Sequence, residues 1–407
     1  MSNSVAMLSV HTSPLDSPGR TKDAGGMNVY IRELARELGR RQTPVDIFTR
    51  WTNEHTPRIV SLGERVRVIH IQAGPVAPVH KHDLYHYLPT FVQSIEAFRR
   101  AEARNYDVVH SHYWLSGVAA AQLAQRWDVP HITMFHTLGR LKQLANPYEP
   151  EPPLRMEMEQ QLVQQADRII AATTDERAQI VRYCGVSANR VQVIPCGVDL
   201  RLFTGQDKQE ARKRLGLKSS QPVLLFVGRL DPFKGPDLFL RAAAMMKEQA
   251  QLVVVGGKLH GDKELQELQR LACDLDVSQR VHFLGARPQQ ELPLLYSAAD
   301  VTVVPSYHES FGLVAVESLA CGTPVVATRA GGLMTIVRNN ETGYLVPRCP
   351  GFFAERLDAL LGEPELLARM ELAARSSVLR YSWSSVADQV NQIYEDVIDD
   401  MACLVAQ

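Results

Sequence analysis

Residues 300–328 read DVTVVPSYHESFGLVAVESLACGTPVVAT, and this stretch decides the fold class. A short run rich in β-branched residues is followed by a loop, by a helix-like apolar segment, and by a second short run, PVVAT. Strand, helix and strand in this order predict a βαβ unit with parallel strands. Glu309 then falls in the loop after the first strand. Glu317 falls on the helix, and its apolar surroundings predict a nearly buried carboxylate that needs a partner.

The same alternation runs along the whole chain in two series. The first series comprises VAMLSV, VDIFT, VRVIHI, DVVHSH, HITMFH, RIIAAT and RVQVIP, and the second comprises PVLLFVG, QLVVVGG, RVHFLG, DVTVVP, PVVAT and GYLVP. Runs of this kind with helical segments between them predict an α/β protein with two doubly wound parallel sheets. We expect the first strand over residues 5–11, the join near 195–209, and a last helix after Ser382 as a candidate N-cap.

Composition excludes several classes of protein. The chain has 407 residues, 45% hydrophobic and 22% charged, with a formal net charge of −1. A nucleic-acid or membrane-surface protein would carry a basic excess. No apolar run approaches the ~20 residues that a spanning helix needs. The start lacks the basic region typical of a signal peptide, so we expect none, and the six cysteines form no C-x-x-C pair, so we expect free buried thiols and a cytoplasmic protein.

Ligands of open parallel sheets bind beyond the carboxyl ends of the strands, so the residues found there are the candidates. Gly25 and Gly26 open a helix and favour an anion, or they form a plain tight turn. Arg229 and Lys234 follow PVLLFVG and would clamp a diphosphate, unless they belong to a solvated loop. At the helix after Glu309, backbone N–H groups of residues 310–313 would cradle a phosphate. The alternative interpretation is that Glu309 and Glu317 are simply two carboxylates on the protein surface.

Histidines and scattered cations complete the candidates in the first half. His110 and His112 alternate on a strand, and His80, His82 and His86 cluster, but no carboxylate or cysteine completes a metal set. His136 follows a strand end and suits a polar role in an active site, with a core histidine as the alternative. The remaining cations together suit a second anion such as an acceptor phosphate; they are Lys81, Lys142 and Arg155.

Three stretches carry a resemblance: GRLDPFKG, ESFGLVAVESLACGTPVVATRAGGL and ETGYLV. They resemble the retaining nucleotide-sugar glycosyltransferases of family 4, over nearly the whole chain. The resemblance implies a GT-B fold, with two Rossmann-like domains facing each other across a cleft. It implies an N-terminal acceptor domain over residues 1–197, a C-terminal nucleotide-sugar domain over 198–381, and a last helix over 382–407 that crosses back to the first domain.

The resemblance also assigns roles by motif. Catalytic roles fall to His136, Arg229, Lys234 and Glu309. Donor contacts fall to Gly26, Arg229, Lys234, Arg287, Glu309, Ser310, Phe311, Gly312, Leu313 and Glu317. Acceptor contacts fall to Gly25, Asn28, Lys81, Tyr113, Thr137, Lys142 and Arg155. The family needs no metal and no cofactor beyond its UDP-sugar substrate, so the expected partners are small molecules, with no nucleic acid and no membrane. A homodimer is compatible with the sequence.

Two subfamilies compete for the acceptor. HTLGRLKQL resembles sucrose-phosphate synthases, whereas HTSPLDSPG, DAGGMNVYI and HSHYWLSG resemble the inositol-phosphate N-acetylglucosaminyltransferases of mycothiol synthesis. The leading interpretation is transfer of glucose from UDP-glucose to fructose 6-phosphate, although Asn28 departs from the usual Gln of the sucrose-phosphate synthases. The alternative is transfer of N-acetylglucosamine to an inositol phosphate. From a different class, a nucleotide-sugar epimerase or a non-catalytic binder stays open.

Overall fold

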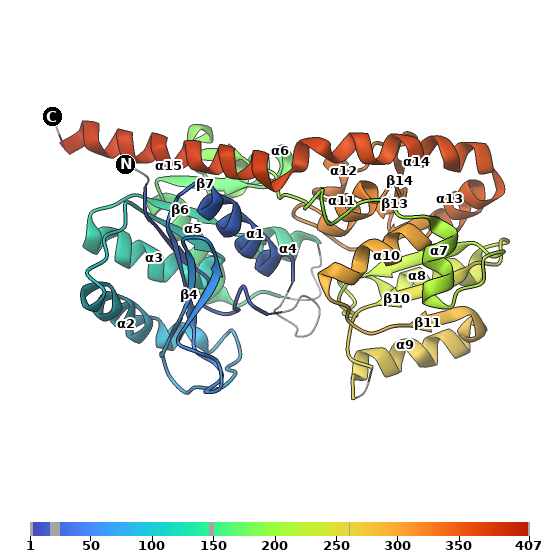
Figure 1. Ribbon diagram of the computed structural model, residues 1–407, viewed down its shortest axis with the longest axis horizontal. Coiled ribbons are helices and arrows are strands. Elements are labelled where there is room, and N and C mark those ends of the chain that lie inside the picture. Colours follow the sequence, from blue (N-terminus) through green and yellow to red (C-terminus); the bar gives the residue numbers. More distant parts are fainter. Residues whose placement is uncertain (1–2, 17–24, 146–149, 260, 406–407) are drawn as a thin grey trace. The chain divides into compact units, whose positions relative to one another are not determined.

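The computed structural model describes residues 3–16, 25–145, 150–259 and 261–405, which form two compact units (Figure 1). Of the described residues, unit 1 comprises 3–16, 25–145, 150–197 and 383–405, and unit 2 comprises 198–259 and 261–382. The chain thus passes from one unit to the other after Gly197 and returns after Ser382. Val198 N donates to Tyr381 O at 2.7 Å, so the outgoing and returning segments lie side by side.

Unit 1 is built on an eight-stranded sheet of order β3-β4-β2-β1-β5-β6-β7-β8. Its strands are β1 Val5–Leu8, β2 Val45–Arg50, β3 Ile59–Gly63, β4 Val66–Ile71, β5 Val108–His112, β6 His131–Met134, β7 Arg168–Ala171 and β8 Val191–Val193. Its helices are α1 Gly26–Arg40, α2 Leu88–Ala101, α3 Trp114–Trp127, α4 Gly139–Ala145, α5 Pro153–Gln165, α6 Thr174–Cys184 and α15 Trp383–Val405, with short 3₁₀ turns at Leu84–Tyr87 and Ala188–Arg190.

The sequence prediction for this sheet needs two corrections. The edge strand β3 pairs antiparallel with β4, so the sheet is mixed rather than parallel throughout. Its pattern of mostly exposed residues lacks the apolar run by which the buried strands were found. The first strand also ends at Leu8 rather than at residue 11, because Ser9 already bonds to Thr12 O in the loop that follows.

Unit 2 is built on a six-stranded parallel sheet of order β11-β10-β9-β12-β13-β14. Its strands are β9 Val223–Val227, β10 Gln251–Val255, β11 Val281–Phe283, β12 Val301–Val304, β13 Val325–Thr328 and β14 Gly343–Val346. Its helices are α7 Lys208–Leu215, α8 Pro236–Met245, α9 Lys263–Asp274, α10 Leu292–Ala298, α11 Leu313–Ala320, α12 Leu333–Ile336, α13 Pro350–Gly362 and α14 Pro364–Val378, with 3₁₀ turns at Ser278–Arg280, Gln289–Glu291 and Leu379–Tyr381.

Each sheet is buried between helices, which explains the near-continuous apolar strands. In unit 1, α2, α3 and α5 contribute to one hydrophobic core with the strands. In unit 2, α8, α9 and α13 do the same, while α10 and α11 pack elsewhere on the strands. The six cysteines are all free thiols, but only Cys184, Cys196 and Cys321 are buried, so the expectation of buried thiols holds for half of them.

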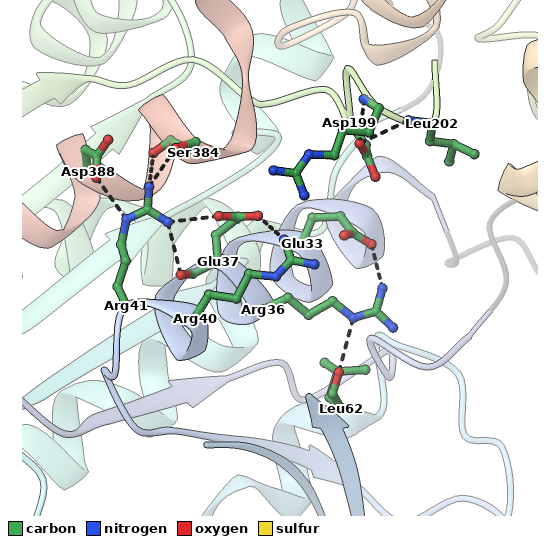
Figure 2. Close-up of polar contacts among 11 residues, drawn as sticks. Glu33, Arg36, Glu37, Arg40, Arg41, Leu62, Asp199, Leu202, Ser384 and Asp388 are labelled. Carbon is green, nitrogen blue, oxygen red and sulfur yellow. Dashed lines mark hydrogen bonds and ion pairs between the residues drawn. The ribbon is translucent and has the colours of Figure 1, made fainter. Parts of the chain in front are cut away.

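The last helix, α15, belongs to unit 1 and packs along α1. Arg41 ties the end of α1 to the start of α15 (Figure 2): its guanidinium contacts Asp388 Oδ1 at 2.9 Å and Ser384 Oγ at 2.8 Å. Further along α15, the Tyr394 hydroxyl lies 2.7 Å from His110 Nδ1 in the buried sheet. No helix among the described residues is long and apolar enough to span a membrane.

Candidate functional site

In unit 2, loops at the carboxyl ends of β9 and β12 bring two predicted residues together. Lys234 Nζ, after β9, lies 2.7 Å from Glu309 Oε1, after β12. Ser306 Oγ donates to the same carboxylate oxygen at 2.8 Å. Burial raises the pKa of Glu309, but Lys234 and Ser306 outweigh it and hold that pKa below its usual value. An ammonium group has three donors, so Lys234 can contact Glu309 and still bind a second anion.

Glycines let these loops approach each other closely. Gly235 has φ of +75°, and a Cβ there would lie 2.5 Å from Pro305 O, so only glycine fits between the two strand ends. Gly331 has φ of +51°, and its Cβ would lie 2.1 Å from Glu309 O. Gly332 N donates to that carbonyl at 2.7 Å. The RAGG turn after β13 therefore fixes the backbone of the Glu309 loop.

The predicted phosphate cradle coincides with the start of α11. Gly312 is its N-cap, with φ of +107°, and Leu313 is its first residue. The first intrahelical bonds are donated by Ala315 and Val316 to Gly312 O. Ser310 and Phe311 lie in the turn just before, where N–H groups and the helix dipole favour an anion.

Glu317 is buried, as its apolar surroundings predicted, with 6% of its surface exposed. Its partner is Tyr296, whose hydroxyl donates to Glu317 Oε2 at 2.9 Å, and Gln289 donates to Oε1 at 3.4 Å. Tyr296 lies on α10 and is itself fully buried. Sequence reasoning missed both partners, because an apolar helix gives no sign of which side chain its carboxylate will meet.

Arg229 follows β9, the strand that also leads to Lys234, whereas Arg287 follows β11. Arg229 Nε lies 3.3 Å from Asp231 Oδ2, so the Asp within the predicted turn orients the guanidinium. Arg287 lines a cavity of about 300 Å³ beyond the ends of β10 and β11. The other lining residues are Gly257, Lys258, Leu259, Leu284, Gly285 and Ala286. Its mixed apolar and polar lining at parallel strand ends is the usual place for a ligand in such folds.

In unit 1, the described part of the glycine-rich motif opens α1. Gly25 is the N-cap and Gly26 the first helical residue, although residues 23 and 24 of the same motif lie outside the described residues. Asn28 is completely buried. Its Oδ1 accepts from Gly25 N at 2.9 Å, and its Nδ2 donates to Thr12 Oγ1 and Ser13 O at 2.7 and 2.6 Å. Asn28 therefore fixes the β1–α1 loop, and the acceptor contact predicted for it stays a prediction.

His136 lies just after β6 and bonds to a second histidine. His112 Nδ1, on β5, is 2.9 Å from His136 Nε2. Burial, followed by the nearby His11, lowers the pKa of His136 to about 3, so its ring is neutral near pH 7. Its φ is +59°, and that of Tyr113 at the end of β5 is +76°. Bulky residues rarely adopt this conformation, and such strain is often found at functional sites.

The predicted acceptor cations meet carboxylates that the sequence analysis did not include. Arg155, 3% exposed, donates through Nε to Glu159 and through Nη1 to Glu151, both at 2.7 Å. Its Nη2 donates to Thr137 O, and its guanidinium lies over the Tyr113 ring at 4.9 Å. Lys142 Nζ lies 2.7 Å from the other oxygen of Glu151. The described structure thus brings Tyr113, Thr137, Lys142 and Arg155 together, but around protein carboxylates.

Lys81 belongs to the same region by its electrostatics. It neighbours His82, whose pKa is lowered first by burial and then by His80 and Lys81, with Arg155 adding to the effect and Glu151 opposing it. No group of three or more His, Cys, Asp or Glu residues within the described ranges is arranged to hold a metal ion.

Family models match both units. The model of "Glycosyl transferases group 1" matches residues 207–377, and that of "Glycosyltransferase Family 4" matches residues 24–202. The chain is 44% identical to a D-inositol 3-phosphate glycosyltransferase of Nocardiopsis dassonvillei, over 96% of this chain and 94% of that protein. A protein of the same description from Xylanimonas cellulosilytica is 43% identical, over 96% of each chain.

Solved structures agree on the fold. A sucrose-phosphate synthase from Thermosynechococcus elongatus superposes with a TM-score of 0.91 at 33% identity, covering 98% of this chain and 100% of that one. Anabaena Alr3699/HepE in complex with UDP-glucose gives a TM-score of 0.76 at 21% identity, covering 97% and 100%, a likeness of fold alone. The two Rossmann-like units expected from the sequence are thereby confirmed as those of GT-B glycosyltransferases.

Proposed function

Because this chain belongs to the glycosyltransferases of group 1 and family 4, we propose that it transfers a sugar from a UDP-sugar to a hydroxyl group of an inositol phosphate. The observation that carries the proposal is a pair of cations in unit 1, the buried Arg155 and the partly exposed Lys142. Lys142 and Arg155 converge on one anionic group beyond the ends of β5 and β6, where parallel sheets bind ligands. Two cations at one point suit a phosphorylated acceptor.

The choice of acceptor follows the relatives. Proteins described as D-inositol 3-phosphate glycosyltransferases share 43–44% of residues with this chain, against 33% for the sucrose-phosphate synthase. Fructose 6-phosphate, which led the sequence interpretation, therefore becomes the second candidate, supported by the TM-score of 0.91. With an inositol phosphate as acceptor, N-acetylglucosamine is the donor sugar that the resemblance implies.

The chemistry we propose is a front-face transfer that retains the configuration of the sugar. The bond from the sugar C1 to the diphosphate oxygen breaks, and the acceptor oxygen bonds to C1 on the same face. The acceptor proton passes to the departing phosphate oxygen. Arg229, Lys234 and the start of α11 stabilise the charge that grows on that phosphate, which is usually the largest contribution to catalysis. No step requires a metal, so turnover should survive a chelator.

Glu309 and Glu317 hold the donor in this scheme. Glu317, kept in place by Tyr296, accepts from the ribose hydroxyls, and Glu309 contacts the hydroxyls of the donor sugar while holding Lys234. The cavity beside Arg287 takes the base. Because the His136 ring is neutral near pH 7, it forms a hydrogen bond with the transferred sugar and does not act as a charged general acid.

The role of the phosphate is tested by removing it from the acceptor. The enzyme is incubated with UDP-N-acetylglucosamine and either inositol 3-phosphate or free inositol, and the products are followed by mass spectrometry. We expect a glycosylated product from the phosphate ester only, in the anomeric configuration of the donor. Equal rates with free inositol would refute a phosphate-recognising acceptor site, and an inverted product would refute the front-face mechanism.

A further inference from the structure

Arg155 forms ion pairs with two carboxylates, Glu159 and Glu151, which differ in their other contacts. Glu159 lies one helical turn after Arg155 on α5, bonds its Nε at 2.7 Å, and accepts from Gly139 N at 2.8 Å through its other oxygen. It thereby fixes both the guanidinium and the first residue of α4. Removing Arg155 would leave Glu159 buried without a counter-charge. Glu159 is thus part of the framework.

Glu151 is bound differently. It precedes α5 rather than lying on it, and each of its oxygens contacts a different cation: Oε1 lies 2.7 Å from Lys142 Nζ and Oε2 2.7 Å from Arg155 Nη1. Its side chain is only 6% exposed. Burial raises the pKa of Glu151, but Arg155 and Lys142 together hold it below the usual value, so the carboxylate is charged at neutral pH. Glu151 makes the contacts that a bound phosphate oxygen pair would make.

The surroundings of this carboxylate are those of a ligand site. Tyr113 and Thr137, which meet Arg155 through a ring face and a backbone carbonyl, stand just beyond the ends of β5 and β6. The loop carrying Lys81 and His82 is close enough for Glu151 and Arg155 to act on the pKa of His82. A carboxylate that bridges two cations at this place occupies the position that the proposed phosphate needs.

We propose that, in the free protein, the Glu151 carboxylate occupies the position between Lys142 and Arg155 at which the acceptor phosphate binds. The phosphate displaces this carboxylate on binding. We call this position the phosphate seat. This inference rests on the proposed function, because it identifies the seat with that of the acceptor phosphate. Glu151 then sets the affinity for the acceptor without touching the reacting atoms. In the free protein it supplies a negative charge to Lys142 and to Nη1 of Arg155, whose Nε is bonded to Glu159, and a counter-charge at a buried guanidinium lowers the cost of its burial.

The inference predicts a measurable penalty on acceptor binding. If a site is open for only a fraction of the time, its apparent Kd equals the intrinsic Kd divided by that fraction, so the ligand binds more weakly. If Glu151 leaves the seat open for roughly a tenth of the time, removing its charge tightens phosphate binding about tenfold. Glu151→Gln keeps the size of the side chain and removes the charge. Glu157→Gln is the matched control, because Glu157 is exposed on α5, the helix that Glu151 precedes, and accepts a hydrogen bond from Gln161 at 3.3 Å.

The first experiment needs no turnover. Inorganic phosphate and inositol 3-phosphate are titrated into the wild-type chain, Glu151→Gln and Glu157→Gln by calorimetry. We expect both ligands to bind Glu151→Gln about tenfold more tightly than the other two proteins. Equal or weaker binding by a folded Glu151→Gln would overturn the proposal. Because inorganic phosphate is a ligand here, this outcome does not depend on whether the acceptor is an inositol or a fructose phosphate.

Kinetics and a second variant separate this role from a structural one. In Glu151→Gln the acceptor KM should fall about tenfold while the donor KM stays unchanged; a framework residue would instead raise KM or lower the yield of folded protein. If Glu151→Gln does not fold, Glu151→Asp tests the same point, since the shorter carboxylate cannot reach both cations. Phosphate should bind Glu151→Asp a few-fold more tightly than wild type, and unchanged affinity would overturn the inference.

Discussion

Glu317 is a buried carboxylate that depends on one neighbour for its position. Replacing Tyr296 by Phe removes the hydroxyl that donates to it at 2.9 Å and leaves the ring in place. A hydrogen bond to a charged group contributes about 1.5–3 kcal/mol, so we expect the donor KM to rise roughly tenfold or more. The acceptor KM should not change. Steady-state kinetics with each substrate varied in turn provide the measurement.

The control for this change is Tyr106→Phe in unit 1. The Tyr106 hydroxyl also donates to a buried carboxylate, Asp46, at 2.8 Å. Its loss should lower the stability of the protein by a similar amount without any effect on donor KM. If Tyr106→Phe and Tyr296→Phe raised donor KM equally, Glu317 would have no specific role in holding the donor.

Lys234 provides the second test at this scale. Lys234→Ala should lower kcat by roughly 10²–10³, as expected when one donor to the departing phosphate is lost. The matched control is Lys208→Ala, because Lys208 also pairs with carboxylates of unit 2, Asp300 and Glu371. A change in donor KM alone, with normal kcat, would show that Lys234 binds the donor but does not stabilise the transition state.

Most of the candidate donor residues could be selected from the sequence, because they follow strand ends within recognisable turns, and their contacts with a donor stay a prediction. Their partners could not. Tyr296 stands 21 residues before Glu317 on another helix, and Glu151 looks like any acidic residue in a polar loop. The partners of Asn28 were also beyond the sequence: its side-chain amide bonds to Gly25, Thr12 and Ser13 within the protein.

At the scale of elements, the contact between α1 and α15 is what fixes the returning helix. Arg41 donates to Asp388, to Ser384 and to Glu37, whereas Arg40, next to it, pairs with Glu37 alone and is 61% exposed (Figure 2). Arg41→Ala should lower the free energy of unfolding by about 1–2 kcal/mol, the value of a few partly exposed hydrogen bonds. Arg40→Ala should change it by less than about 0.5 kcal/mol.

Urea denaturation followed by circular dichroism measures this difference as a shift of the transition of unit 1. Identical transitions for Arg40→Ala and Arg41→Ala would show that α15 is held by its apolar contacts alone.

All the strands with apolar runs were predictable from the sequence, because burial on both faces leaves an unmistakable pattern. The edge strand β3 was not, since its mostly exposed residues resemble a loop.

At the scale of the whole molecule, buried histidines make the protein sensitive to acid. Burial lowers the pKa of His110 to about 3 and that of His131 to about 4, below the ~6.5 of an unfolded chain. Between these values the unfolded state binds more protons than the folded state, so stability is complete above about pH 6.5 and is lost as the pH falls. At pH 5 the two histidines together lower the free energy of unfolding by about 4 kcal/mol relative to its value at neutral pH.

The measurement is the free energy of unfolding from pH 7.5 to pH 5, for the wild type and for His131→Asn. If His131→Asn folds, its free energy of unfolding should fall less steeply with decreasing pH than that of the wild type. The difference in slope should be about 1.4 kcal/mol per pH unit below pH 6. Stability that stays constant over this range would contradict the buried, neutral state of these rings. Ten of the thirteen histidines precede residue 197, so the effect belongs to unit 1.

The two-unit α/β architecture and the chemical class were within reach of the sequence, because strand pattern and strand-end motifs both point to them. The acceptor was not, since fructose and inositol phosphates present the same charged group to Lys142 and Arg155. What distinguishes them is the shape of the ring, and no short motif encodes that shape.

One measurement decides the central claim. UDP release is followed from UDP-N-acetylglucosamine and from UDP-glucose, each with inositol 3-phosphate or fructose 6-phosphate, and kcat/KM is compared across the four pairs. We predict the highest value, by at least about a hundredfold, for UDP-N-acetylglucosamine with inositol 3-phosphate, roughly 2.7 kcal/mol in transition-state binding. Turnover confined to UDP-glucose with fructose 6-phosphate would contradict the account and identify a sucrose-phosphate synthase.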